Sequence, residues 1–128
     1  MHRANLLIVT ALLEVGTALP LLVVPALPLA FLLGVREAAP EALLISRVAG
    51  ASLLAIGTAS WYGRFEEQSN AHFGLLIGIL FYNVAAAALL AYAGLGLGLV
   101  GIALWPAVII HAAFAMWCSL SLRAKPSR

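Results

Sequence analysis

The sequence predicts an all-α integral membrane protein whose four transmembrane helices form one antiparallel bundle. Of its 128 residues, 64% are hydrophobic and 9% are charged, against about 25% charged residues in an ordinary soluble domain. The mean hydropathy is +1.07. The apolar residues form long runs without the alternation that marks half-buried strands. This composition excludes a soluble enzyme, a disordered chain and a nucleic-acid-binding domain, and the length predicts a single domain over residues 1–128.

The lengths of the apolar runs define the spans. A helix crosses the hydrocarbon core, roughly 30 Å thick, with about 20 apolar residues, and it satisfies its own backbone amides there. A polar break at 36–41, a hydrophilic loop at 63–70 and a glycine-rich stretch at 93–101 separate the runs. The predicted spans are residues 6–24, 40–62, 71–92 and 101–122.

Residues 25–39 form a proline-rich apolar connection. Pro20, Pro25 and Pro28 indicate that the first helix bends or ends near Val24. We therefore expect an extended or re-entrant segment up to Leu33, covered by protein, with a long kinked helix as the alternative. The first apolar run is too long for a signal-peptide core and contains an internal glutamate, which argues against cleavage.

The distribution of basic residues predicts the orientation. With four spans, both termini and the loop at 63–70 share one side of the membrane, and Arg36 and Arg47 belong to the other side. The bias of Lys and Arg toward cytoplasmic loops then predicts that both termini are cytoplasmic. The basic residues on the predicted cytoplasmic side are Arg3, Arg64, Arg123, Lys125 and Arg128.

A layer of polar side chains lies at mid-membrane depth. At the helical rise of about 1.5 Å per residue, its members fall within a slab about 8 Å deep, with at least one from each span. A charge at this depth costs roughly 3 kcal/mol, so such groups usually face the bundle interior and have partners. The candidate ligand-binding residues are Glu14, Arg47, Tyr82, Asn83 and His111.

Glu14 and Arg47 are the expected ion pair of this layer. Thr10 and Thr17 extend a polar stripe on the helix face of Glu14. The pair is either a packing and register device or part of a site that binds a polar head group or carries a proton. Alternatively, Arg47 extends toward the outer head groups, or Glu14 stays unpaired and uncharged.

No catalytic residue, metal site or cofactor is predicted. His111 is expected to be hydrogen-bonded in the core, and His72 lies about 13 Å away in depth, too far for a bis-histidine haem. A single cysteine, Cys118, excludes an intrachain disulfide and a cysteine-built metal site. Small residues on the face of His111, including Ala107, leave room for another helix or for a ligand.

Gly74 and Gly78 form a G-x-x-x-G pattern in the third span. Glycines four residues apart create a flat groove where another helix can approach closely. The partner is either another helix of this chain or a second chain.

The segment 46–57 contains the pattern R-x-x-G-x-x-L-L-x-x-G. It resembles the second span of small bacterial four-helix membrane proteins, of which the DoxX-like group is one. The stretches 82–86 and 105–111 resemble similar bacterial membrane proteins. The resemblance implies a four-helix bundle in the bacterial inner membrane, and it implies no substrate.

The sequence is compatible with three functions. The first is a non-catalytic accessory or interaction subunit, with a homo-oligomer or a membrane partner as its expected contact. The second is a binding or transport module in which the polar layer holds a lipid head group, a quinone or a small polar solute. The third, a redox subunit that uses quinone, rests only on Tyr82 and His111. The lipid bilayer is an expected partner in each case and nucleic acid in none.

Overall fold

The computed structural model describes residues 2–66 and 69–123, and it is helical with no strand over these residues. Its helices confirm the predicted all-α fold, since four of those described are long and apolar enough to span a membrane. The remaining helix, α2, is short and was not predicted. The helices are α1 (His2–Val23), α2 (Ala26–Leu33), α3 (Pro40–Gly63), α4 (Asn70–Leu95) and α5 (Leu104–Arg123).

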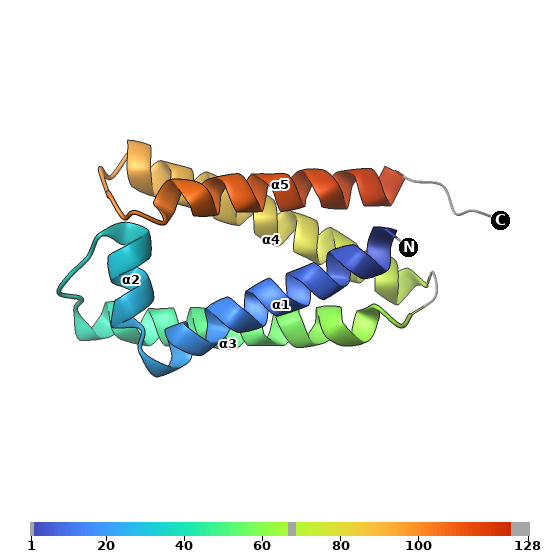
Figure 1. The fold of residues 1–128 in the computed structure, drawn as a ribbon, viewed down its shortest axis with the longest axis horizontal. Coiled ribbons are helices and arrows are strands. Elements are labelled where there is room, and N and C mark those ends of the chain that lie inside the picture. The colour runs from blue at the N-terminus through green and yellow to red at the C-terminus, as the bar shows by residue number, and fades with distance from the viewer. Residues whose placement is uncertain (1, 67–68, 124–128) are drawn as a thin grey trace.

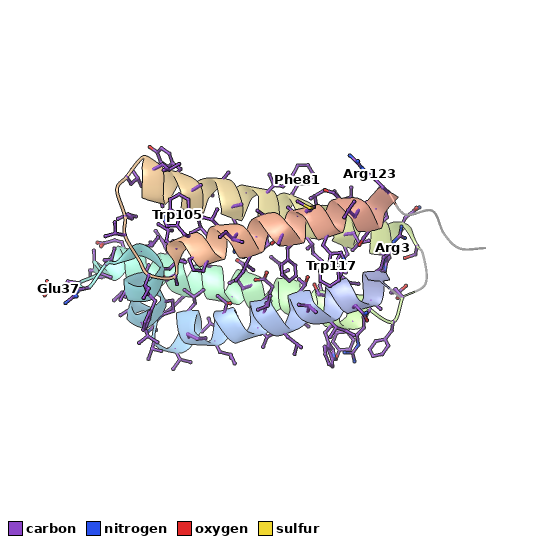
Figure 2. All side chains as sticks on the ribbon, turned by 45° about the horizontal axis from the view of Figure 1, so that its top comes forward. Arg3, Glu37, Phe81, Trp105, Trp117 and Arg123 are labelled. Carbon is purple, nitrogen blue, oxygen red and sulfur yellow. The ribbon has the colours of Figure 1, made fainter. Side chains whose placement is uncertain are left out.

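The long helices direct many of their large apolar side chains outward. Leu12, Ile45, Phe81 and Ile109 are between 63% and 72% exposed, and Figure 2 shows Phe81 pointing away from the helices. Apolar surface of this extent suits contact with lipid rather than with water. The four apolar helices therefore indicate a multi-pass membrane protein.

The long helices run antiparallel along the molecule. The start of α1, the end of α5 and the connection between α3 and α4 lie at one end, and α2 lies at the other (Figure 1). Arg3 and Arg123 accordingly lie at the end opposite to Glu37 (Figure 2). Lys125 and Arg128, which contribute to the predicted orientation, lie outside the described residues.

The proline-rich connection contains a helix instead of the expected extended segment. Helix α2 begins directly after Pro25, and Pro28 is its third residue. Both prolines therefore occupy the start of a helix, where a missing backbone N–H costs little. The helix ends at Gly34, whose φ of 74° is left-handed and whose N–H donates to the carbonyl of Ala30. The end of the first helix near Val24 was predicted correctly. The separate short helix after it differs from the extended segment and from the single kinked helix that the sequence suggested.

Helices α1 and α3 pack closely through glycine. A Cβ atom on Gly50 would lie 3.0 Å from the carbonyl oxygen of Ala18, and one on Gly57 would lie 3.2 Å from that of Ala11. Side chains of α1 would be closer still, at 2.9 Å for Gly50 and 2.8 Å for Gly57. We call this contact the glycine seam. Small residues let helix backbones approach in this way, which increases dispersion contacts where no water drives association.

The G-x-x-x-G pattern forms no close contact with the part of the chain that the structure describes. A Cβ atom on Gly74 or on Gly78 would meet no atom within 4 Å. Both glycines line an open groove of about 440 Å³ between α3 and α4, which we call the α3–α4 groove. Its other lining residues are Ala55, Ile56, Ala59, Leu75 and Ile79.

A buried apolar cluster joins α1, α4 and α5 toward the end that carries the termini. Leu6, Leu7, Leu76, Ile79 and Cys118 form it, each no more than 2% exposed. Glu14 lies two turns further along α1 than Leu6 and Leu7. The cluster therefore closes the space between the helices on one side of the polar layer.

Helix α2 closes the opposite end. The N–H of Ala103 donates to the carbonyl of Phe31 at 2.9 Å, and a Cβ atom on Gly101 would overlap the backbone of Leu32. These contacts attach α2 to the connection between α4 and α5. The apolar cluster and α2 thus bound a space between α1, α4 and α5.

Candidate functional site

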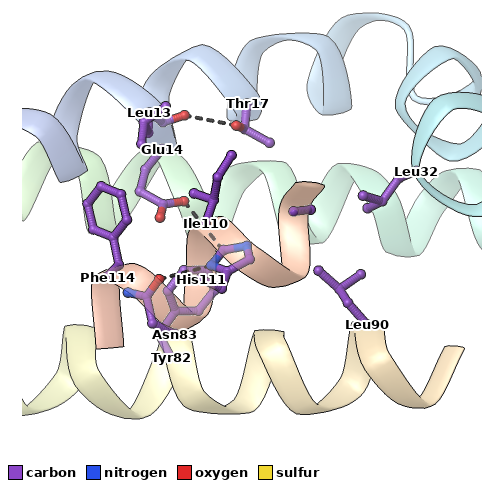
Figure 3. A pocket seen from close by; sticks show the side chains of 11 residues that line it. Leu13, Glu14, Thr17, Leu32, Tyr82, Asn83, Leu90, Ile110, His111 and Phe114 are labelled. Carbon is purple, nitrogen blue, oxygen red and sulfur yellow. Dashed lines mark hydrogen bonds between the residues drawn. The ribbon is translucent and has the colours of Figure 1, made fainter. Parts of the chain in front are cut away.

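A pocket of about 160 Å³ lies in this space (Figure 3). Helices α1, α4 and α5 form its walls, and α2 contributes one leucine. Most of the lining is apolar, with a few polar groups that point toward one another. The lining residues are Leu13, Glu14, Thr17, Leu32, Tyr82, Asn83, Leu90, Ala107, Ile110, His111 and Phe114.

The predicted polar layer converges on this pocket except for one member. Glu14, Tyr82, Asn83 and His111 all line it, and Arg47 does not. These four residues come from three helices, and the rise of the helix had placed them at similar depths. Equal depth and an inward direction therefore account for their meeting.

The expected ion pair between Glu14 and Arg47 is not formed among the described residues. Arg47 is exposed on α3, while Glu14 is 7% exposed and accepts a hydrogen bond from Tyr82. The reason is the direction of α3, whose buried face includes Ser46 and Gly50 and lies against α1 at Gly50. Residue 47 follows Ser46 by about 100° around the helix, which turns it off that face.

Glu14 and Tyr82 connect α1 to α4. The Tyr82 hydroxyl donates to Oε2 of Glu14 at 3.4 Å. This hydrogen bond is long for an O–H···O contact, so it holds the carboxyl group weakly and leaves most of its acceptor capacity unused.

Asn83 fixes the orientation and the protonation of His111. Its Nδ2 donates to the carbonyl of Ile79 at 2.8 Å, which leaves Oδ1 as the atom 2.9 Å from Nδ1 of His111. An amide oxygen only accepts, so Nδ1 carries the proton. In the neutral imidazole, Nε2 is then an acceptor. The ring also stands edge-on to Tyr82, with centroids 5.5 Å apart and an interplanar angle of 85°.

The threonine stripe divides between pocket and core. Thr17 lines the pocket and donates its hydroxyl to the carbonyl of Leu13 at 2.8 Å. Thr10 is fully buried, and its hydroxyl has no hydrogen-bond partner within the described part of the chain. Only Glu14 and Thr17 of the predicted stripe therefore belong to the site.

Sequence reasoning missed the apolar walls of the pocket. Phe114 lies three residues after His111, a spacing that places both on one helix face and that could have indicated its position. Leu32 gave no such signal, because its place depends on the fold of α2. Among residues 2–66 and 69–123 there is no group of three His, Cys, Asp or Glu side chains that could hold a metal ion.

Comparisons with protein-family models, curated proteins and solved structures give no match for this chain. The resemblance to the DoxX-like group therefore stays a prediction from the quoted segments.

Proposed function

We propose that this protein binds a small amphipathic molecule inside the membrane. The molecule's polar head lies against Glu14, Tyr82 and His111, and its apolar part extends along the pocket wall toward lipid. One observation carries the proposal: polar groups from α1, α4 and α5 converge on one apolar pocket. Concave, mostly apolar sites with a few oriented polar groups are the usual form of small-molecule sites.

The volume of the pocket limits the size of the head. At about 160 Å³, it is similar to a protein cavity of about 150 Å³ that holds benzene. A single ring or a short chain with one polar group therefore fits inside. A larger ligand extends past the pocket.

The proposal is tested by filling the pocket. Ala107→Leu introduces bulk at the lining, and Ala112→Leu makes the same change at an exposed position of the same helix. We expect native mass spectrometry of protein extracted in mild detergent to detect a bound small molecule in the wild type and in Ala112→Leu, and not in Ala107→Leu. Equal occupancy in the two variants, or an empty wild-type protein, would contradict the proposal.

The α3–α4 groove supports a second candidate, the accessory or interaction subunit. Gly74 and Gly78 expose a flat strip of backbone with free space above it. Cross-linking in native membranes tests this role, with Gly78→Leu expected to abolish a complex. Gly16→Leu, at another open glycine, is the matched control. A chain that is monomeric and without partner under every mild condition argues against this role.

The proposed location is the bacterial inner membrane, with both termini in the cytoplasm. The arrangement of α1 and α5 supports it, because the start of one and the end of the other share an end of the molecule with Arg3 and Arg123 (Figure 2). A reporter that is active only in the cytoplasm, fused after Arg128, is expected to be active. If a reporter that is active only in the periplasm is active at the same position, the termini are periplasmic and the proposed orientation is wrong.

A further inference from the structure

The hydrogen-bond donors of the pocket are directed to partners within the protein. Tyr82 donates to Glu14, and the Thr17 hydroxyl donates to a backbone carbonyl. Asn83 donates to the carbonyl of Ile79, and Nδ1 of His111 donates to Asn83. A ligand that offers only acceptors therefore finds few groups in the pocket to bind it.

The acceptors of the pocket are not used up. In its ionised form, the Glu14 carboxyl group has two oxygens with about four acceptor positions, and Tyr82 occupies one of these positions on Oε2. Because Nδ1 of His111 carries the proton, Nε2 offers a lone pair. These two groups can accept hydrogen bonds, so they favour a ligand that donates hydrogen bonds.

The carboxyl group also lacks a basic partner. No ion pair involves Glu14 within residues 2–66 and 69–123, and Arg47 is exposed on another helix. A charge in a low-dielectric site is stabilised chiefly by an opposite charge close to it. Tyr82 and Phe114 add aromatic rings to the lining, and the faces of such rings attract cations.

We propose that the head of the ligand is an organic ammonium group attached to an apolar body. The ammonium group lies beside the Glu14 carboxyl group, which is ionised in the complex, and donates hydrogen bonds to it and to Nε2 of His111. The apolar body lies along the lining toward Leu90 and Leu32. This inference rests on the proposed function and specifies its ligand class. It disfavours phosphate or carboxylate heads, which would face Glu14 as like charges, and quinones, which offer only acceptors.

Three probes with one apolar body and different heads test the class: 2-phenylethylammonium, 2-phenylethanol and phenylacetate. The full chain is placed in nanodiscs of zwitterionic lipid, and dissociation constants are measured by calorimetry against empty nanodiscs. We expect the ammonium probe to bind about tenfold or more tightly than the alcohol, since hydrogen bonds to a charged group are stronger than neutral ones. Phenylacetate is expected to bind weakest.

The variant Glu14→Gln keeps the shape and removes the charge. We expect it to bring the affinities for the ammonium and alcohol probes together, whereas Glu41→Gln, at an exposed position at the start of α3, retains the full difference. His111→Phe removes the second acceptor and provides a test that does not depend on the folding of Glu14→Gln. It is expected to weaken binding of the ammonium probe by a smaller factor.

The outcomes separate this inference from the proposed function. If the alcohol or phenylacetate binds as tightly as the ammonium probe, the pocket binds ligands but the ligand class is wrong. An ammonium preference that survives in both Glu14→Gln and His111→Phe also overturns the inference. If no probe binds, neither proposal stands.

Discussion

Two pairs of glycines have very different surroundings. The members of one pair are seven residues apart in α3, and those of the other are four residues apart in α4. Gly50 and Gly57 lie in the glycine seam. A Cβ atom added to Gly50 or Gly57 would lie 3.0 or 3.2 Å, respectively, from a backbone carbonyl oxygen of α1. Gly74 and Gly78 border the α3–α4 groove, where an added Cβ meets nothing within 4 Å. The pair with the recognised G-x-x-x-G spacing is the one that meets no close neighbour among residues 2–66 and 69–123. The spacing of glycines shows which face of a helix could pack closely against another helix. Whether that face is packed depends on where the other helices lie.

The largest expected effect comes from filling the seam. Gly57→Leu forces bulk against Val15 and the backbone of Ala11, and overpacking of this kind costs about 3 kcal/mol or more when backbone must move. Gly78→Leu meets open space and is expected to change stability by less than about 1 kcal/mol. Thermal unfolding of both variants in the same detergent measures the difference. Equal losses would show that both glycines lie at close contacts.

A smaller loss is expected at Gly101, a third glycine at a backbone contact. Gly101→Ala places its Cβ against the backbone of Leu32, so α2 must shift, at a cost of about 2 kcal/mol. Hydrogen exchange at the N–H of Ala103, which donates to Phe31, is expected to accelerate. Unchanged exchange would mean that α2 is held by other contacts. Gly98→Ala is an unsuitable control because its φ is 67°, and Gly16→Ala serves instead.

The next largest loss of stability is expected from breaking the contact between Asn83 and His111. Asn83→Leu leaves Nδ1 of His111 without its acceptor, and an unsatisfied buried polar group costs about 1–3 kcal/mol. His111→Phe combined with Asn83→Leu removes both partners and is expected to recover part of this loss. The unfolding free energies of the two single variants and the double variant form the required cycle. Additive losses would mean that the two side chains do not interact.

The smallest expected effect has the opposite sign. Gly78→Ala places a methyl group in open space and raises helix propensity, so stability is expected to increase by up to about 1 kcal/mol. Gly57→Ala, the matched change in the seam, is expected to lower stability. A destabilised Gly78→Ala protein in detergent would indicate that another chain covers the groove.

The lengths of the helices were predictable because the thickness of the bilayer sets the length of an apolar run. The spans predicted at 40–62 and 71–92 correspond to Pro40–Gly63 and Asn70–Leu95. Helix α2 was not predictable from the same rule. Prolines that end one helix also suit the start of the next, and the contacts at Gly101 that hold α2 come from residues about 70 positions later.

The depth of the site residues was predictable, and their direction was not. A fixed rise per residue places Glu14, Asn83 and His111 at similar depths whatever the packing. Which helix faces them depends on how helices pair, and the glycine seam directs α3 toward a face of α1 away from the pocket. Charge complementarity therefore predicted an ion pair with Arg47 that the packing does not permit.

The hydrogen bond between Glu14 and Tyr82 joins residues that are 68 positions apart. During synthesis, α1 is made well before α4, so the Glu14 carboxyl group at first has no hydrogen bond from Tyr82. The face of α1 that carries Ala11 and Ala18 is meanwhile available to α3 as soon as α3 emerges. The order of synthesis therefore allows α1 and α3 to associate before the polar contacts of the pocket can be complete.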